Sequence, residues 1–230
     1  MRIVVKVGTS TLAHATGRLN IRHVEKLVKV LSDLKNAGHE VVLVSSGAIG
    51  MGVGKLMLKG RPADMPTKQA AAAVGQCELM YTYDKLFTEY DHTVAQILLT
   101  GADIEHEDRR LNFENTLYRL LELGALPIVN ENDTVATEEI AVGDNDTLGA
   151  IVARCAKADL LVLLSDIDGL VHEPPPKWIK RVKNHRPLTL ILVCTHKRPS
   201  RIGRDYLQEI TTFAMLAPGR ETCVTSHASG

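Results

Sequence analysis

Short apolar runs alternate with segments of helical periodicity along the first part of the chain. Residues 3–7 and 41–44 are nearly continuous apolar runs rich in β-branched residues, which is typical of strands buried on both faces of a sheet. Between them, apolar residues recur from Val24 to Leu34 at the spacing of one helical face, and Gly38 stands where a glycine commonly ends a helix. This stretch therefore predicts a strand, a helix and a second strand.

The same alternation continues as far as residue 164. The pattern predicts helices at 69–87, 109–123 and 147–157, and strands at 93–99, 126–129 and 160–164. Five strands separated by helices indicate right-handed β-α-β crossovers. We therefore expect an α/β fold in which helices cover both faces of a mainly parallel sheet.

Polar and small residues follow the predicted strands, at the edge where parallel sheets bind ligands. These segments are residues 8–10, 45–48, 130–133 and 165–166. Because the carboxyl ends of parallel strands lie at one edge of a sheet, we expect these segments to contribute to one site.

Lys6 interrupts the first apolar run, two residues before Gly8. Burying an isolated ammonium group is costly, so a lysine at this position needs a reason. One interpretation is that its ammonium binds phosphate oxygens, while Gly8 lets backbone N–H groups approach the same anion. The alternative is a lysine at a strand end whose charged group reaches solvent.

Two other segments carry groups suited to ligand binding. Ser46 and Gly47 could seat a carboxylate or phosphate, or could form an ordinary serine cap with a glycine turn. Residues 130–146 concentrate carboxylate and amide side chains, which suit an ammonium group or a metal-bound phosphate. Asp and Asn also cap turns in ordinary loops. The density of the cluster, at the edge where ligands bind, favours a binding role.

Composition excludes several classes of protein. The 230 residues include 27 basic and 27 acidic side chains, which argues against a strongly basic nucleic-acid binder. No apolar run approaches the roughly 18 residues of a membrane span, and no secretory leader is expected. Four scattered cysteines indicate neither a disulfide framework nor a zinc site. We expect a cytoplasmic protein with no nucleic-acid or membrane partner.

A lysine, glycine turns and a carboxylate–amide loop form the inventory that phosphoryl transfer requires, because its transition state needs positioning and charge neutralisation. The Walker A and protein-kinase motifs are absent from the sequence. Instead, four motifs resemble, in order, those of the glutamate 5-kinases, a branch of the amino acid kinase family. They are residues 4–10, 44–49, 127–133 and 142–146. The resemblance runs from residue 1 to about residue 183, which we take as the kinase domain.

The resemblance implies a three-layer αβα sandwich of the amino acid kinase (carbamate kinase-like) type. It implies ATP-dependent phosphorylation of the γ-carboxylate of L-glutamate, the first step of proline biosynthesis. Mg²⁺ would accompany ATP, proline would be a possible feedback inhibitor, and the protein would form a homo-oligomer, either a dimer or a tetramer. No residue is predicted as a metal ligand.

The resemblance also assigns roles to individual residues. Lys6 is expected to meet the transferring phosphate, and Asp146 to orient the phosphate-binding lysines, so both are candidate catalytic residues. The expected substrate-binding residues are Ser46, Gly47, Asp133, Asp144 and Asn145. The expected nucleotide-binding residues are Lys6, Gly8, Ser165 and Asp166.

The resemblance ends before residues 184–230, where the family would show a glycine-rich nucleotide loop and a second phosphate-binding lysine. Residues 171–230 hold three glycines, none adjacent to another, and the strand–helix alternation does not continue with its earlier quality. The abrupt change favours a shifted reading frame or a truncated form. The alternative is a genuine divergent end that supplies its cation from Lys197, Arg198, Arg201 or Arg204.

Two expectations follow for the region after residue 183. We expect a divergent tail without the RNA-binding-type domain that follows the kinase in many relatives. Because the glycine-rich loop and its lysine are missing, the alternative function is a catalytically impaired or inactive module that binds glutamate or proline.

Overall fold

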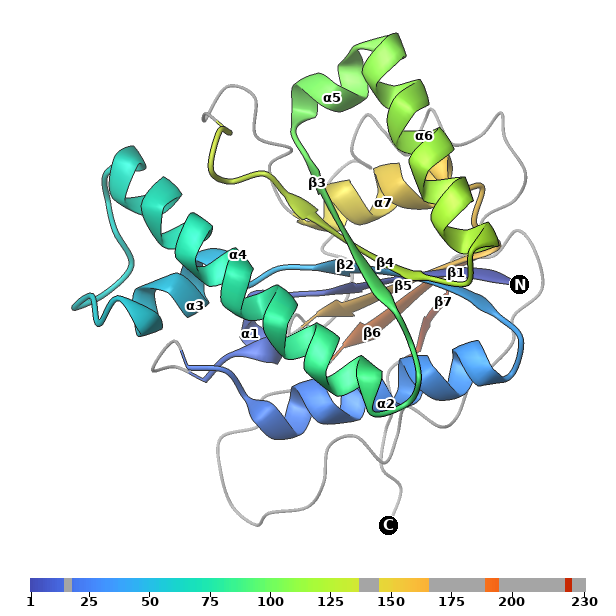
Figure 1. The fold of residues 1–230 in the computed structure, drawn as a ribbon, viewed down its shortest axis with the longest axis horizontal. Coiled ribbons are helices and arrows are strands. Elements are labelled where there is room, and N and C mark those ends of the chain that lie inside the picture. The colour runs from blue at the N-terminus through green and yellow to red at the C-terminus, as the bar shows by residue number, and fades with distance from the viewer. Residues whose placement is uncertain (15–17, 137–144, 166–188, 195–221, 225–230) are drawn as a thin grey trace.

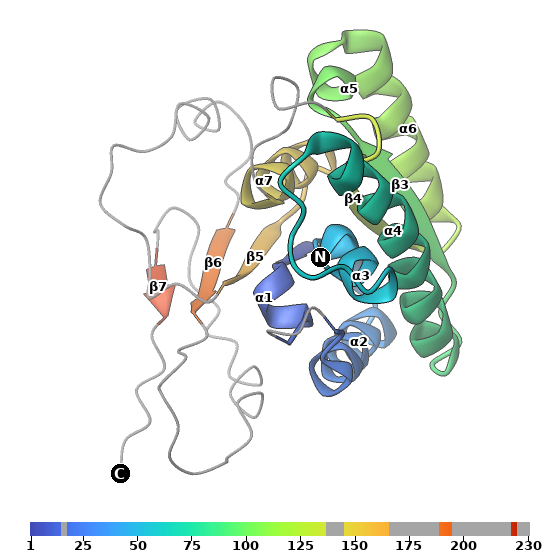
Figure 2. The same cartoon turned by 90° about the vertical axis from the view of Figure 1, so that its left-hand side faces the viewer.

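A seven-stranded sheet lies between two layers of helices (Figure 1). The computed structural model describes residues 1–14, 18–136, 145–165, 189–194 and 222–224. The strands are β1 Arg2–Val7, β2 Glu40–Ser45, β3 Val94–Leu99, β4 Leu126–Glu131, β5 Leu160–Ser165, β6 Thr189–Cys194 and β7 Thr222–Val224. Their order is β3-β4-β2-β1-β5-β6-β7, and every described pairing is parallel. Figure 2 shows β5, β6 and β7 following one another at one side of the sheet.

The helices divide between the two faces of the sheet. They are α1 Thr9–Leu12, α2 Ile21–Asn36, α3 Ala48–Lys55, α4 Met65–Thr88, α5 Gly101–Glu105, α6 Glu107–Glu122 and α7 Asn145–Cys155. Side chains of α1 to α4 share one buried cluster with the sheet, and side chains of α5 to α7 share the other. The expected α/β fold with three layers is therefore confirmed.

The alternation of side chains along β1 supplies both cores. Ile3, Val5 and Val7 belong to the cluster under α1 to α4, whereas Val4 belongs to the cluster under α5 to α7. Successive residues of a strand point to opposite faces, so Lys6 points to the same side as Val4, where α7 crosses the sheet. The strand therefore places Lys6 on the face of the sheet that α7 covers.

Local signals set where the longer helices begin and end. The side chain of Asn20 accepts a hydrogen bond from the backbone N–H of His23 at the start of α2. Asp64 does the same for Thr67 at the start of α4. The helix α2 ends before Gly38, whose φ of +85° favours glycine. These caps fix the ends of the two long helices that cover one face.

Helices α3 and α4 pack against each other with their backbones in close contact. A Cβ at Gly75 would lie 1.7 Å from the carbonyl oxygen of Ala48, and a Cβ at Gly52 would lie 1.8 Å from that of Ala71. Backbone therefore packs directly on backbone at both positions. This packing holds the short helix α3, and the residues just before it, in a fixed place at the carboxyl end of β2.

The five strands predicted from the apolar runs are all present, as are the four longer helices. The short helices α1, α3 and α5 were not predicted, because four to eight residues are too few to display a helical period. Beyond residue 183, where no alternation of similar quality was expected, the structure describes the two further parallel strands β6 and β7.

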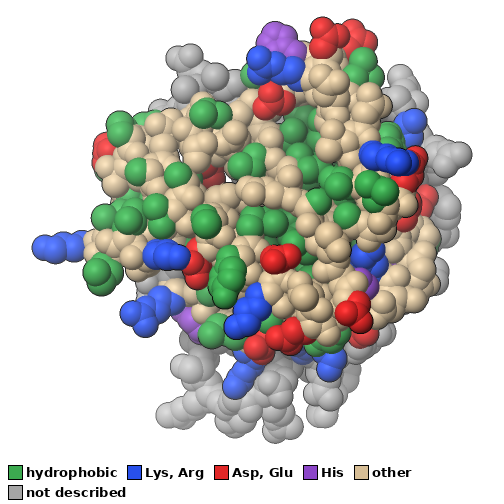
Figure 3. Space-filling model, viewed as in Figure 1, with side chains coloured by type: hydrophobic (Ala, Val, Ile, Leu, Met, Phe, Trp, Pro, Cys, Tyr) green, Lys and Arg blue, Asp and Glu red, His purple; other side chains and the backbone are tan. Residues whose placement is uncertain are grey.

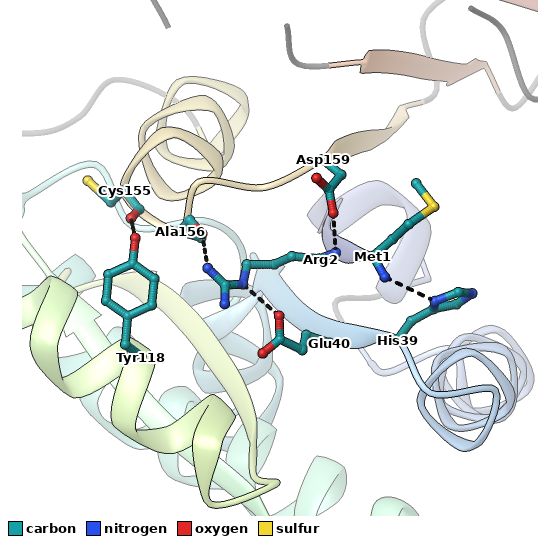
Figure 4. A network of polar contacts seen from close by, with 8 residues as sticks. All are labelled: Met1, Arg2, His39, Glu40, Tyr118, Cys155, Ala156 and Asp159. Atoms are coloured by element: carbon teal, nitrogen blue, oxygen red, sulfur yellow. Dashed lines mark hydrogen bonds and ion pairs between the residues drawn. The ribbon is translucent and has the colours of Figure 1, made fainter. Parts of the chain in front are cut away.

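A network of polar contacts closes the amino ends of β1, β2 and β5 (Figure 4). The Arg2 side chain donates from Nε to Glu40 at 2.9 Å and from a terminal nitrogen to the Ala156 carbonyl at 2.5 Å. The Arg2 backbone N–H donates to Asp159 at 2.7 Å, and its guanidinium lies over the ring of Tyr118, 5.1 Å from the centroid. At this end of the sheet, hydrogen bonds and an ion pair between these residues hold the three strands together.

Candidate active site

A pocket of about 610 Å³ lies at the carboxyl ends of β1, β2 and β4. Its described lining comes from the start of α1, from the residues between β2 and α3, from α3 and the loop that follows it, from the end of β4 and the residues after it, and from the first residue of α7. These residues are Thr9, Ser46, Gly47, Ala48, Ile49, Gly50, Val53, Leu58, Lys59, Gly60, Arg61, Asn130, Asp133 and Asn145. The pocket therefore lies at the edge of the sheet where the polar segments after the strands were expected to form a site.

Lys6 is buried and paired. Its side chain is 9% exposed, and its Nζ lies 2.6 Å from a carboxylate oxygen of Asp146, which belongs to the first turn of α7. Gly149, one turn further along α7, lets the helix approach, because a Cβ there would lie 3.2 Å from the Cβ of Lys6. The interpretation of Lys6 as a solvent-reaching lysine is therefore wrong.

The ammonium group of Lys6 lies close to the glycine that follows β1. A Cβ at Gly8 would lie 3.5 Å from Lys6 Nζ, so a larger residue at this position would crowd the ammonium. Gly8 also begins α1, and its carbonyl accepts from the backbone N–H groups of Thr11 and Leu12. A lysine charge and an open glycine turn thus occur together, as a phosphate site requires.

Ser46 is held by the residue next to Asp146. The Asn145 side-chain amide donates a hydrogen bond to Ser46 Oγ, which joins the first residue of α7 to the end of β2. Gly47 has a φ of +111°, in the region that favours glycine, and precedes α3 without a side-chain cap. The ordinary serine-cap interpretation of this segment is therefore wrong, because Ser46 bonds across the site instead.

Asp133 contributes a carboxylate in an unfavourable environment. Burial, together with the nearby charge of Glu131, raises the pKa of Asp133 to about 6, against an opposing effect of Arg61. A carboxylate whose charge is poorly stabilised by the protein gains most when a ligand brings a cation. Asp133 is therefore suited to receive an ammonium group.

Asn130 lies deep in the pocket and was not among the assigned site residues, although it belongs to the same polar stretch. It is 2% exposed, and its amide nitrogen donates to Gln76 Oε1 on α4 at 2.9 Å. This bond uses one of the two N–H donors of the amide, so the amide oxygen and the second N–H can meet a ligand. Its place directly after a buried apolar run was the sequence signal that could have identified it.

The pocket also contains residues that were given no individual role from the sequence. Residues 58–61 form part of the loop between α3 and α4, and Thr9 lies at the start of α1. Figure 3 shows Lys and Arg side chains projecting at the left-hand end of this face, where Figure 1 shows the connection between α3 and α4. The two basic residues flanking Gly60 were the available signal.

The structure brings together most of the assigned site residues. Seven of them lie at the carboxyl edge of the sheet: Lys6, Gly8, Ser46, Gly47, Asp133, Asn145 and Asp146. Ser165 is the last residue of β5, the strand beside β1. Asp144 and Asp166 lie outside the described residues, so their expected roles stay predictions.

Among the described residues, no group of three or more His, Cys, Asp or Glu side chains could hold a metal ion. None of the described helices is long and apolar enough to cross a membrane. Cys77 and Cys155 are free thiols.

Comparison with known proteins gives a consistent result. The chain is 58% identical over 174 residues to the glutamate 5-kinase of Clostridium acetobutylicum, a match that covers 76% of this chain and 65% of that protein. It is 56% identical over 178 residues to the glutamate 5-kinase of Listeria welshimeri, with 76% and 64% covered. It is 55% identical over 175 residues to that of Caldanaerobacter subterraneus, with 76% and 47% covered.

The matched region spans from about half to about two thirds of the length of these curated relatives. The sequence model of the amino acid kinase family matches residues 1–190, which include β1 to β5 and all the described site residues. The motifs that follow β1, β2 and β4 and their convergence on one pocket agree with that match. The chain belongs to the amino acid kinase family.

Proposed function

We propose that this protein phosphorylates the γ-carboxylate of L-glutamate with ATP, forming L-glutamyl 5-phosphate, the first step of proline biosynthesis. The observation that carries the proposal is a pair of consecutive residues. Asn145 bonds to Ser46 on the amino-acid side, and Asp146 pairs with Lys6 on the phosphate side. Relatives named glutamate 5-kinase, 55–58% identical to this chain, support the same reaction.

The amino-acid substrate would occupy the described pocket. Its ammonium group suits Asp133, and Ser46, Gly47 and Asn145 offer polar contacts along its length. The chain's described pocket has room for a small zwitterion, which needs several fixed polar partners rather than a large apolar surface. We also assign Asp144 to this set, on the resemblance alone.

The phosphoryl step needs charge neutralisation more than it needs a base. The γ-carboxylate is ionised at neutral pH, so its oxygen attacks the terminal phosphorus of ATP directly and ADP leaves with the electron pair of the broken P–O bond. Two anions must approach each other in this step, and Lys6 offsets their repulsion. Asp146, 2.6 Å from Lys6 Nζ, holds the ammonium in position.

The nucleotide would lie beyond β1 and β5. We assign Gly8, Lys6, Ser165 and Asp166 to its binding, and we infer that Mg²⁺ arrives with ATP. Mg²⁺ commonly binds through phosphate oxygens, waters and one or two carboxylates, so a dedicated cluster of protein ligands is not required.

Several finer points belong to the same proposal. We infer that residues 1–183 form the kinase domain and that residues 184–230 form a divergent tail. We also infer that the protein forms a homo-oligomer, that proline inhibits it by feedback, and that it is located in the cytoplasm. The free thiols of Cys77 and Cys155 suit a reducing compartment. The comparisons do not support the alternative of an inactive binding module.

A coupled assay of ADP release tests the proposed reaction. The full chain is expected to release ADP with L-glutamate and Mg-ATP, and to release far less with L-aspartate or N-acetyl-L-glutamate. Aspartate is shorter by one methylene group, and acetylation removes the ammonium charge that Asp133 would receive. Equal rates with the three acceptors would overturn the assignment of substrate.

A further inference from the structure

Three charged side chains line the pocket within the described part of the chain. Asp133 follows β4, while Lys59 and Arg61 belong to the loop that joins α3 to α4. Figure 1 shows this connection projecting from the body of the fold at the left-hand side. The pocket therefore has one anionic residue on the sheet edge and two cationic residues on a single loop.

The charges of the proposed substrate need matching partners. This step rests on the proposed function, in which L-glutamate presents an ammonium group, an α-carboxylate and a γ-carboxylate. The γ-carboxylate must face the phosphate side, where Lys6 pairs with Asp146. The ammonium group suits Asp133. The α-carboxylate is attached to the same carbon as the ammonium group, so its partner must be a cation or donor close to Asp133.

Arg61 is the cation that meets this requirement. It lines the same pocket as Asp133, and its positive charge opposes the upward shift of the Asp133 pKa. Lys59 also lines the pocket, but an ammonium is a point charge, whereas the planar guanidinium of Arg61 matches a carboxylate with two parallel donors. Arg61 is exposed and makes no ion pair within 4 Å with any other residue that the structure describes. Among the described residues, none therefore occupies its guanidinium as an ion-pair partner.

We propose that Arg61 binds the α-carboxylate of the amino-acid substrate and thereby selects acceptors that carry a free α-carboxylate beside a free α-ammonium. A guanidinium donates two parallel N–H bonds to a carboxylate, which fixes orientation as well as charge. With Asp133 and Arg61 holding the two charges of the α-carbon, the side chain of the substrate can extend only toward Lys6. The reacting carboxylate is thus distinguished from the α-carboxylate.

The proposal predicts a particular pattern of ligand discrimination. Glutarate keeps both carboxylates but lacks the ammonium group, so it loses the contact with Asp133. The α-amide of L-glutamic acid (isoglutamine) keeps the ammonium and the γ-carboxylate but has no α-carboxylate charge. Arg61 should therefore matter for L-glutamate and should matter little for the α-amide.

The test is calorimetric binding of L-glutamate and of its α-amide to the full chain without nucleotide, in wild type and Arg61→Met. Loss of a charged hydrogen-bonding pair is expected to weaken L-glutamate binding by roughly 10- to 100-fold. Binding of the α-amide should change by less than about threefold, and Arg61→Lys should restore part of the affinity because it keeps the charge.

Lys59→Met is the matched control, since Lys59 lies on the same loop and lines the same pocket. It should weaken L-glutamate binding by less than about threefold if Arg61 is the specific partner. Unchanged glutamate affinity in Arg61→Met, or an equal loss for glutamate and the α-amide, would overturn this inference alone. Absence of glutamate binding to the wild-type chain would overturn the proposed function itself.

Discussion

The two ends of β1 each place a cation against carboxylates, but they use it differently. At the amino end, Arg2 contacts Glu40, the Ala156 carbonyl, Asp159 and Tyr118, so nearly every polar group there has a protein partner. At the carboxyl end, Lys6 contacts Asp146 beside an open pocket, and Asp133 keeps a raised pKa. At the amino end of β1 the charged groups are paired within the protein, whereas at the carboxyl end the charged groups lie beside a pocket that can bind ligands.

The difference separates residues that stabilise the fold from residues that prepare a site. Satisfied polar groups lower the free energy of the folded state, whereas a carboxylate held above its usual pKa raises it at neutral pH. In the described structure the amide oxygen of Gln76 accepts from Asn130, while the buried amide nitrogen of Gln76 lacks a hydrogen-bond partner. Substitutions at the two ends of β1 should therefore affect different measurements.

Lys6→Met should produce the largest effect of any single change at the carboxyl end. Removing one preorganised group that neutralises charge costs roughly 10²- to 10³-fold in turnover. The affinity for L-glutamate should change by less than about threefold, because the amino-acid contacts come from other residues. Steady-state kinetics together with calorimetry would measure both, and a similar loss in each would contradict a role for Lys6 in the phosphoryl step.

Gly75→Ala should lower stability more than any polar substitution at either end. The new Cβ would meet the Ala48 carbonyl at 1.7 Å, so backbone would have to move. We expect the free energy of unfolding to fall by about 2–3 kcal/mol, measured by urea denaturation. Gly60→Ala is the control, because nothing lies within 4 Å of a Cβ there. An equal effect of both changes would show that the α3–α4 contact tolerates separation.

Asp133→Asn should weaken L-glutamate binding by roughly 10- to 100-fold at pH 7, since the ammonium group loses its counter-charge. In the wild type, affinity should fall as the pH drops below about 6, because Asp133 becomes protonated there. The affinity of the variant for L-glutamate should not change with pH between about pH 5 and pH 7, which is roughly one unit on each side of the Asp133 pKa. Calorimetry across this range measures the effect.

The same substitution should also stabilise the unliganded protein at neutral pH. A carboxyl pKa raised in the folded state means that the folded protein binds the proton more tightly, so this group favours folding more as the pH falls through about 6. Removing the charge should therefore raise the melting temperature at pH 7 by about 2–4 °C. A lower melting temperature would show that the Asp133 carboxylate supports the fold.

Arg2→Met should have the smallest effect on activity, because it should change stability alone. The change keeps the apolar stem but removes the ion pair with Glu40, the bond to the Ala156 carbonyl and the contact with Tyr118. We expect a loss of about 1–2 kcal/mol in the free energy of unfolding, with turnover and glutamate affinity unchanged. A fall in turnover without a fall in stability would show that the two ends of β1 are not independent.

Much of the fold could be predicted from the sequence, because strands buried on both faces leave long apolar runs. Residues 41–44 and 160–164 show this, and they became the centre of β2 and most of β5. Helix α3 was missed because its eight residues contain three glycines and show little periodicity. The strands β6 and β7 were missed because the chain around them lacks the regular alternation of the earlier part.

The site was predicted in part for a similar reason. Polar segments after apolar runs could be recognised from the pattern alone, whereas Ser46, Asp133 and Asn145 were singled out by the resemblance of their motifs, and all three line the pocket. The pairing of Lys6 with Asp146 was expected from the resemblance alone, because the two residues are far apart in the chain and their contact depends on where α7 crosses the sheet. Arg61 was missed because a basic residue in a polar loop looks the same whether it faces solvent or a pocket.

The first turn of α7 acts on both halves of the proposed reaction at once. Asn145 and Asp146 are adjacent in the chain, yet one bonds to the end of β2 and the other to the lysine of β1. A small tilt of this helix would displace both contacts in the same movement. Substitutions that shift α7 should therefore alter acceptor binding and phosphoryl transfer together, because both contacts depend on the position of the same helical turn.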